Sequence, residues 1–317
     1  MAGCDRGGMD FQHADVFAEA PFTGNSVTVF MTGGRPLPAG QMLAITQEFR
    51  HFESIFLAPG ADGTRWRARV FDQIEELDFA GHPLLGAAAV LHDRLGGDPA
   101  RQWTIELPAK TVTVRTTRDA AGFRGTLDQG RPEFGRVIAG AEVAPVLDGL
   151  GLSEADLVPG LDPAVVSTGL RYLVIPVTAA ALARVAITAA DFAGRLAAVG
   201  AQYSYLLDPD ALEGRHWTND GAVEDVATGS AAGTAGAYLA RAGRVALNQP
   251  FVLHQGRFTG RPSQLQVEPR GSGGQGGSAG VETVLVGGHV AMVATGSLRS
   301  LPAAVPGPAR LTGARLR

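Results

Sequence analysis

Two short segments of this chain repeat one plan, and the repeat limits the possible folds more than any other feature. Residues 79–88 read FAGHPLLGAA and residues 224–233 read EDVATGSAAG, so each places glycine and small residues at the start of an expected helix. Aligning Gly81 with Gly229 also brings identical residues into register: Glu76 with Glu224, Ala87 with Ala235 and Leu91 with Leu239. The sequence therefore predicts a duplicated architecture, in which each copy wraps sheet around a hydrophobic helix whose N-terminus faces a cleft between the copies.

The length and the apolar pattern favour two similar domains of the α+β class. The 317 residues exceed the usual size of a single core. In the first half, apolar spacing predicts strands and helices as follows: strands at 14–17, 26–30, 51–57 and 66–71, helices at 38–50 and 83–95, and a hairpin of 103–107 with 111–115. The second half repeats this pattern with strands at 171–177 and 203–207 and a helix at 230–241.

These elements predict an N-terminal domain of residues 1–126 and a C-terminal domain of residues 127–317, with termini that are able to cross between them. Each domain is expected to hold a mixed or antiparallel sheet around a central helix, and the C-terminal strands are expected to pack mainly on the second domain. Residues 268–280, rich in glycine and serine, predict a flexible loop, and the tail after Pro302 predicts poor order.

Composition favours small-molecule chemistry. A formal net charge of -4 and a pI near 6.0 provide no basic surface for nucleic acid or for an anionic membrane. Cys4 is the only cysteine, which excludes disulfide scaffolds and cysteine-rich zinc sites. No apolar run approaches the roughly 20 residues of a membrane helix, and the first nine residues lack the apolar core of a signal peptide. We expect a cytoplasmic enzyme.

No cofactor or metal motif is present. The glycines of residues 229–236 lack the spacing and the preceding apolar strand of a dinucleotide fingerprint. Residues 276–280 fit the hydrolase pattern G-x-S-x-G, but the strand and helix of a nucleophile elbow do not flank them. The seven histidines form no H-E-x-x-H or comparable cluster. The sequence predicts neither a cofactor nor a metal.

The helix start at Gly229 predicts an anion site. The first turn of a helix leaves N–H groups without partners and carries the positive end of the helix dipole. Thr228, Gly229 and Ser230 are therefore expected to hold a substrate carboxylate beside Asp225. His82 takes the position in the first helix that Ser230 has in the second.

Each of these residues also has an ordinary structural interpretation. Glu53, beside a helix-to-strand junction, also fits a solvated strand carboxylate, and His82 also fits a helix cap. Asp225 also fits a first-turn acid that complements the helix dipole, and Ser230 also fits close packing. Residues 255–263 fit a simple strand connection.

At the level of whole motifs, the sequence resembles the phenazine biosynthesis PhzF-like family. The motifs follow the order of that family and span almost the whole chain: residues 21–25 (PFTGN), the strand that holds Glu53, residues 79–83 (FAGHP), 167–170 (STGL), 224–233, and Gln255-Gly256 with 260–263 (GRPS). The resemblance implies the two-domain diaminopimelate-epimerase fold, a homodimer, and cofactor-free isomerisation in which an enol becomes a ketone.

The resemblance also assigns residues. The carboxylate base of the family matches Glu53, its cleft histidine matches His82 beside Gly81, and its aspartate and serine match Asp225 and Ser230. The diaminopimelate epimerase and proline racemase relatives use two cysteines, and this chain has none at the corresponding positions, so the thiol mechanism is excluded.

The chain departs from the family pattern at positions expected to line the approach to the cleft. Val226 replaces a usual proline, Asp78 stands where proline or a small residue is common, and His216-Trp217 replaces methionine and phenylalanine. These changes leave the substrate open.

We therefore expect an isomerase that moves a proton on a small carboxylated amino or hydroxy acid by acid–base catalysis, with Glu53, His82 and Asp225 as catalytic residues and Gly81, Thr228, Gly229 and Ser230 as substrate-binding residues. Two alternatives remain. One is an epimerase, cyclase or lyase of the same fold in natural-product biosynthesis, and the other is a non-catalytic dimeric ligand-binding protein.

Overall fold

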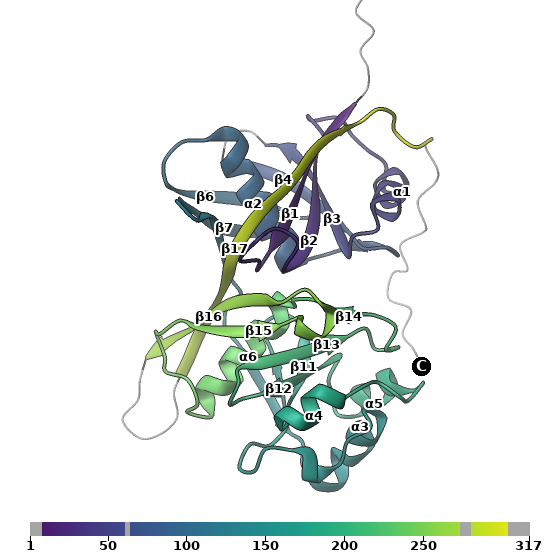
Figure 1. Ribbon diagram of the computed structural model, residues 1–317, viewed down its shortest axis with the longest axis vertical. Helices are drawn as coiled ribbons and strands as arrows, with labels where there is room; N and C mark the ends of the chain where they lie inside the picture. Colours follow the sequence, from purple (N-terminus) through teal and green to yellow (C-terminus); the bar gives the residue numbers. More distant parts are fainter. Residues whose placement is uncertain (1–7, 61–63, 273–279, 304–317) are drawn as a thin grey trace, which may run out of the picture. The chain divides into compact units, whose positions relative to one another are not determined.

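The computed structural model describes residues 8–60, 64–272 and 280–303, and it shows a mixed α+β protein dominated by strands (Figure 1). The chain divides into two compact units. Unit 1 contains the described residues up to Gly125 together with those from His289 onward, and unit 2 runs from Thr126 to Gly288.

The described residues of unit 1 form a mixed sheet and two helices. Its strands are β1 (Met9–Val16), β2 (Asn25–Met31), β3 (Glu53–Pro59), β4 (Arg65–Phe71), β5 (Glu76–Leu77), β6 (Ala100–Glu106) and β7 (Thr111–Asp119), and its helices are α1 (Ala39–Phe49) and α2 (Gly81–Leu95). Strand β8 (Gly122–Asp128) crosses into unit 2. The pairs β1–β2, β3–β4, β4–β5 and β6–β7 are antiparallel, whereas β2–β3 and β4–β6 are parallel.

Helix α2 is buried along almost its whole length, and small residues make this possible. Every residue from His82 to His92 is buried, and the helix packs on β1, β2, β3 and β7. A Cβ at Gly86 would lie 2.6 Å from Val27 Cγ1, so only glycine lets the helix approach β2 this closely. Pro83 is tolerated because the first helical turn does not use its N–H.

Unit 2 repeats the strand pairing of unit 1. Its strands are β9 (Glu133–Val137), β10 (Ala164–Ser167), β11 (Arg171–Pro176), β12 (Tyr203–Asp208), β13 (Glu213–Trp217), β14 (Glu224–Asp225), β15 (Phe251–Gln255), β16 (Ser263–Ser272) and part of β17 (Gly280–Leu298). The pairs β10–β11, β12–β13, β13–β14 and β15–β16 are antiparallel, and β11–β12 and β13–β15 are parallel. The sequence of parallel and antiparallel pairs is thus the same in both units.

The helices of unit 2 are α3 (Ala144–Gly149), α4 (Ala179–Arg184), α5 (Phe192–Ala198) and α6 (Gly229–Arg241), with 3-10 turns η1 (Gly140–Glu142), η2 (Glu154–Asp156) and η3 (Arg257–Thr259). Helix α6 packs on β10, β11, β12 and β16 and is buried from Ala231 to Ala240. It follows β14 as α2 follows β5, with the same number of residues between strand and helix.

This repeat makes positions in the two units comparable. Glu53 pairs with Val27 at the start of the parallel β2–β3 ladder, and Tyr203 pairs with Tyr172 at the start of β11–β12. Glu76 on β5 and Glu224 on β14 are equivalent, as the alignment of the helix starts predicted.

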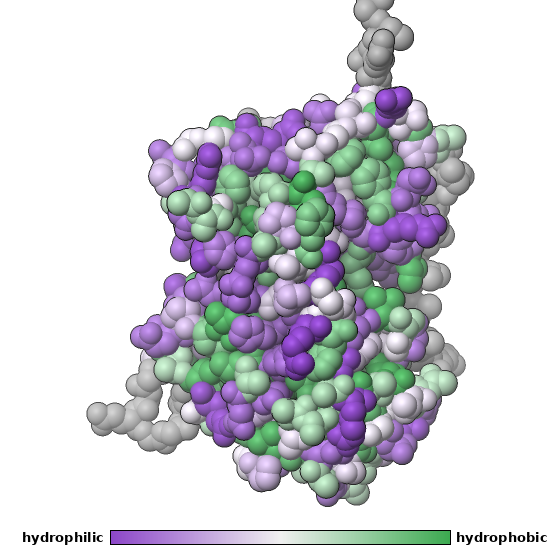
Figure 2. All heavy atoms as spheres, viewed as in Figure 1, coloured by the Kyte–Doolittle hydropathy of each residue, from purple (hydrophilic) through white to green (hydrophobic). Residues whose placement is uncertain are grey.

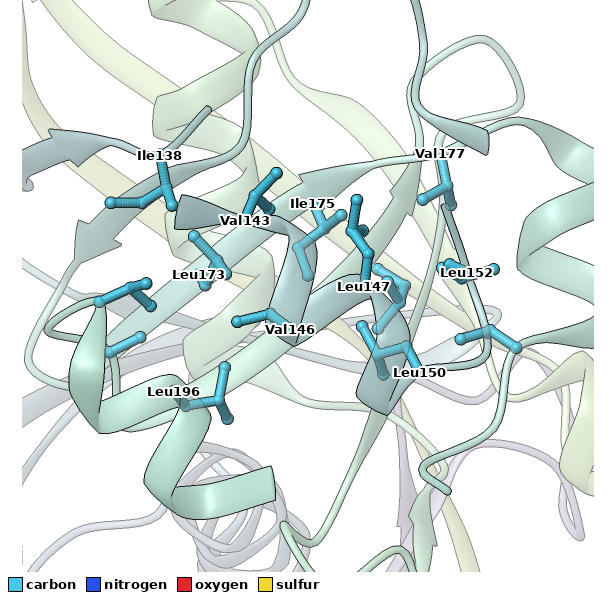
Figure 3. Packing of buried hydrophobic residues seen from close by; sticks show 14 of the residues in the cluster. Ile138, Val143, Val146, Leu147, Leu150, Leu152, Leu173, Ile175, Val177 and Leu196 are labelled. Atoms are coloured by element: carbon cyan, nitrogen blue, oxygen red, sulfur yellow. The ribbon is translucent and has the colours of Figure 1, made fainter. Parts of the chain in front are cut away.

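Each unit also has an apolar cluster outside its long buried helix. In unit 2, α3 and α5 place Val146, Leu147 and Leu196 against Leu173 and Ile175 of β11 (Figure 3). In unit 1, α1 places its apolar residues against three stacked or edge-on phenylalanines of β2, β3 and β4, namely Phe30, Phe56 and Phe71. On the face shown in Figure 2, polar and apolar residues are intermixed over each unit.

Two predictions about the C-terminal region need correction. Residues 268–272 continue strand β16 and pair with β17, because the alternation of buried residues extends through Pro269; residues 273–279 of the expected loop lie outside the described residues. The C-terminal half of β17 pairs with β1, from Val290 opposite Val16 to Leu298 opposite Met9, so these residues belong to unit 1 and not to the second domain.

Cys4 and the tail from residue 304 onward also lie outside the described residues. Within the described part of the chain, no helix is long and apolar enough to cross a membrane.

Candidate active site

A carboxylate and an imidazole meet at the start of helix α2. Glu53 is the first residue of β3, and His82 is the second residue of α2. Glu53 is 8 % exposed, and one of its carboxylate oxygens, Oε2, lies 3.4 Å from Nδ1 of His82. This distance allows an ion pair or a proton shared through small movements, as is common for catalytic groups without bound substrate. The structure therefore brings together two of the predicted catalytic residues.

Gly81, the predicted binding residue beside this pair, begins α2. A Cβ at Gly81 would meet no atom of the described residues within 4 Å, and its φ is not in the left-handed region. Neither packing nor backbone strain within these residues requires glycine here. The start of α2 is therefore open around Gly81 among the described residues.

Asp225 is held by a buried hydrogen-bond network in unit 2. Its side chain accepts hydrogen bonds from Thr228 Oγ1 at 2.6 Å and from the Ala227 N–H at 3.4 Å. Gln255 Nε2 donates to the Asp225 carbonyl at 2.9 Å and to Thr228 Oγ1 at 3.0 Å. Gln255 Oε1 in turn accepts from Tyr205 and from the Thr228 N–H, at 3.1 and 3.3 Å. Asp225 is thus oriented, and it is 7 % exposed.

Thr228 contributes to the same network. Its hydroxyl donates to Asp225 and its N–H donates to Gln255, so both of its donors have partners inside the protein. Thr228 thus orients Asp225, and its contact with a substrate stays a prediction.

Gln255 belongs to one of the motifs that carry the family resemblance, but its hydrogen-bond partners were not predicted. It ends β15 and contacts the Asp225 segment, which a simple strand connection does not require. The signal was the glycine that follows it: Gly256 has φ +84°, and a Cβ there would lie 2.3 Å from the Arg261 carbonyl and 2.6 Å from the Val226 carbonyl. A residue at this position must be glycine for Gln255 to reach the network.

Helix α6 presents N–H groups at its start. The first intrahelical bond after Thr228 runs from the Ala232 N–H to the Thr228 carbonyl at 2.9 Å. The N–H groups of Gly229, Ser230 and Ala231 come before it, and they have no hydrogen bond to another described residue. The Ser230 hydroxyl lies 2.8 Å from the hydroxyl of Tyr172. Gly229 and Ser230 therefore fit the predicted anion site.

The two residues of the His216-Trp217 pair lie in different surroundings. His216 pairs with Asp225 across the β13–β14 ladder, whereas Trp217 is buried in the apolar cluster of unit 2, under the guanidinium of Arg215. The expectation that Trp217 lines the approach to a cleft is wrong, because successive strand residues point to opposite faces of a sheet.

The predicted residues fall into two groups, Glu53 with His82 in unit 1 and Asp225 with Ser230 in unit 2. Their convergence on one substrate stays a prediction. Among the described residues, no three His, Cys, Asp or Glu side chains are grouped closely enough to hold a metal ion.

Solved structures share the fold. A Pseudomonas aeruginosa protein described as a predicted epimerase is 48 % identical, with a TM-score of 0.82 over 91 % of this chain and 98 % of its own. A PhzF-family protein from Bacillus anthracis has a TM-score of 0.77 at 21 % identity, over 92 % of this chain and 99 % of its own. A hydroxyproline epimerase from Agrobacterium vitis shares the fold at a TM-score of 0.58 and 15 % identity, over 92 % of each chain. The mixed α+β fold is that of the PhzF proteins and of proline racemase-like structures. Curated relatives named as isomerases show that the class of protein is an isomerase.

The family follows from the sequence match. The family model described as phenazine biosynthesis-like protein matches residues 14–296, and the chain belongs to this family. The trans-2,3-dihydro-3-hydroxyanthranilate isomerase of Pseudomonas fluorescens is 31 % identical over 81 % of this chain and 89 % of its own length. The uncharacterized isomerase YddE of Escherichia coli O157:H7 is 32 % identical over 80 % of this chain and 88 % of its own.

Proposed function

We propose that this isomerase moves a proton between atoms of a small carboxylated amino or hydroxy acid, with Glu53 as the group that removes and returns the proton. The observation that carries the proposal is the buried Glu53–His82 pair, with 3.4 Å between carboxylate and imidazole. A buried carboxylate beside an imidazole can act as base and then as acid, because the imidazole stabilises either protonation state of its partner.

His82 and Asp225 serve in the proposal as groups that stabilise or relay charge. As the substrate C–H bond breaks, its electron pair moves toward an oxygen of the substrate, and its proton goes to Glu53. The free N–H groups at the start of α6 would hold the substrate carboxylate, because fixed donors at a helix start favour negative charge without reorganisation.

The known relatives support isomerase chemistry without defining the substrate. One relative is named for an isomerisation of trans-2,3-dihydro-3-hydroxyanthranilate, and another is described as a predicted epimerase. In the proposal, either kind of reaction begins with removal of a proton from carbon, so the same Glu53 base would serve both. Epimerisation, cyclisation and elimination remain the alternative outcomes of the same first step.

Isotope exchange tests the proposal. Wild-type protein in deuterium oxide should convert trans-2,3-dihydro-3-hydroxyanthranilate or a related cyclic amino or hydroxy acid, and NMR should show deuterium at the reacting carbon. Glu53→Gln should lower this rate by at least about 10²- to 10⁴-fold, because glutamine keeps the shape of the side chain and cannot carry the proton.

Glu48→Gln is the matched control, because Glu48 is an exposed glutamate on α1 of the same unit. It should leave the rate unchanged. Activity of Glu53→Gln within threefold of wild type would remove Glu53 as the base. The homodimer and the cytoplasmic location stay predictions, and light scattering at working concentration tests the dimer.

A further inference from the structure

A histidine that the proposed mechanism does not use lies beside Asp225. His216 is on β13, and its backbone pairs with that of Asp225 on β14. By the repeated strand pairing of the two units, His216 has the position that Val70 has in unit 1, where Val70 pairs with Leu77. Unit 2 thus has a polar pair where unit 1 has two aliphatic residues.

The hydrogen bond of His216 identifies its tautomer. Its Nδ1 lies 2.9 Å from the carbonyl oxygen of Ser204. A carbonyl oxygen only accepts, so Nδ1 must carry the hydrogen and donate it. In the neutral ring, Nε2 then has a lone pair, and no described residue forms a hydrogen bond with it. The free position of His216 is therefore an acceptor.

Two tyrosines enclose this imidazole edge-on. The ring centroids of Tyr172 and Tyr203 lie 5.5 and 5.7 Å from that of His216, with interplanar angles of 74° and 87°. The hydroxyl of Tyr172 also reaches Ser230, whose N–H belongs to the start of α6. Tyr172 thus contacts both His216 and Ser230, so the Nε2 acceptor of His216 and the N–H donors at the start of α6 lie in the same part of unit 2.

We infer that His216 contributes to substrate specificity. Its Nε2 accepts a hydrogen bond from a hydroxyl or amino group of a small acid whose carboxylate is held at the start of α6. The inference rests on the proposed function for the carboxylate and for an amino or hydroxy acid as substrate, and it adds the residue that recognises the amino or hydroxyl group. An acid without such a donor would leave a largely desolvated acceptor without a partner and would bind more weakly.

The neutral ring persists under working conditions. Burial lowers the pKa of His216 from its ordinary value of 6.5, while the charge of Asp225 and the bond to the Ser204 carbonyl act in the opposite direction. The groups that face the ring are Asp225 from β14, Tyr172 from β11 and Tyr203 from β12. A base with a lowered pKa stays neutral above that value and gains a proton as the pH falls through it. Binding of a donor-bearing acid should therefore weaken as the pH falls through this lowered pKa of His216, and not as the pH rises.

Calorimetry with stable aromatic acids tests the inference without any turnover. The probes are benzoate, which has only a carboxylate, and the 2- and 3-hydroxy- and 2- and 3-aminobenzoates, which add one donor. Wild-type protein should bind at least one donor-bearing probe about tenfold more tightly than benzoate at a pH near neutrality. His216→Met should reduce this preference to less than about twofold, because methionine fills the space without a comparable acceptor.

His216→Gln keeps an acceptor oxygen but does not titrate, so it should retain much of the preference and lose the weakening at low pH. The matched control is His254→Gln, which changes an exposed histidine of the same unit and should reproduce wild-type binding. Any of three outcomes would overturn the inference. These are an equal preference for donor-bearing probes over benzoate in wild type and His216→Met, an unchanged pH dependence of binding in His216→Gln, and no binding of any donor-bearing probe to wild type. The probes are not turned over, so their binding does not depend on Glu53 as a base. Activity of Glu53→Gln within threefold of wild type would therefore contradict the proposed function without affecting the binding result for His216.

Discussion

The ion pair of Arg215 with Glu224 fastens the two strands that carry His216 and Asp225. Arg215 Nε and Nη2 donate to the two carboxylate oxygens of Glu224, both at 2.8 Å, and Nη1 donates to the Leu182 carbonyl at 2.7 Å. The side chains of Arg215 and Glu224 are only 9 % and 13 % exposed. Arg215 directly precedes His216, and Glu224 directly precedes Asp225. The ion pair therefore fixes the pairing of β13 with β14 from the face of the strands opposite to His216 and Asp225.

Arg215→Met should therefore destabilise the protein strongly. The substitution keeps an apolar side chain beside Trp217 and leaves Glu224 buried without its partner, a change that typically costs about 3–5 kcal/mol. At roughly 2–4 °C per kcal/mol for a unit of this size, the thermal midpoint should fall by about 6–20 °C. Adding Glu224→Met should recover most of the loss, because two apolar side chains leave no buried charge.

Arg136→Met provides the matched control for this experiment. Arg136 also makes a two-bonded contact with a glutamate, Glu142, but the side chains are 61 % and 53 % exposed. Its loss should cost less than about 1 kcal/mol, since water replaces the pair. Calorimetric scans of the wild-type protein and these three variants decide the matter. Equal midpoints for Arg215→Met and Arg136→Met, or no recovery in the double variant, would refute the reasoning.

Three further predictions concern the site. His82→Ala and Asp225→Ala should each slow the single-turnover step, and the fold-loss in rate of the double variant should be smaller than the product of the two single fold-losses if the residues act as a unit. A normal single-turnover rate with only about 1 kcal/mol of lost stability would show helix capping instead. Gln255→Leu should cost at least about 1–3 kcal/mol in denaturant unfolding, because it leaves buried donors unpaired, and it should slow turnover through Asp225; a variant with wild-type stability and rate would contradict the network. Gly256→Ala should lower the thermal midpoint more than Gly243→Ala, since both have positive φ but only the Cβ at Gly256 would clash with carbonyl oxygens, and equal midpoints would argue against that clash.

Local patterns were sufficient to predict most elements and the helix starts. Helices expected at 83–95 and 230–241 are present as Gly81–Leu95 and Gly229–Arg241, because dense small and apolar residues mark buried helices clearly. The resemblance assigned Glu53 and His82 to one site, but it did not state that they touch, because that contact depends on how the sheet brings two separate segments together.

Long-range pairing could not be predicted from local patterns. Nothing in residues 289–298 indicates β1 as their partner, since an alternating strand fits any sheet edge. The role of Gln255 was hidden for a related reason: its partners are 27 and 30 residues away, and a glutamine side chain has no preferred local structure that reveals them. The sequence also did not show which face of β13 each side chain takes. All five residues of this short strand are buried, so its burial pattern does not separate the face of Trp217 from that of His216.

The pairing of β1 with the end of β17 has a consequence for the order of folding. Unit 2 is a continuous stretch of chain, so all its strands are available once residue 288 has been synthesised. In unit 1, Val16 at the end of β1 pairs with Val290 of β17. At about 5–20 residues per second, the ribosome needs on the order of 10–60 s after Val16 to supply Val290. During that interval β1 is an open edge able to pair with another chain, a recognised route to aggregation. Glu53 and His82 thus belong to the unit whose sheet is completed last, although their own segments are synthesised first.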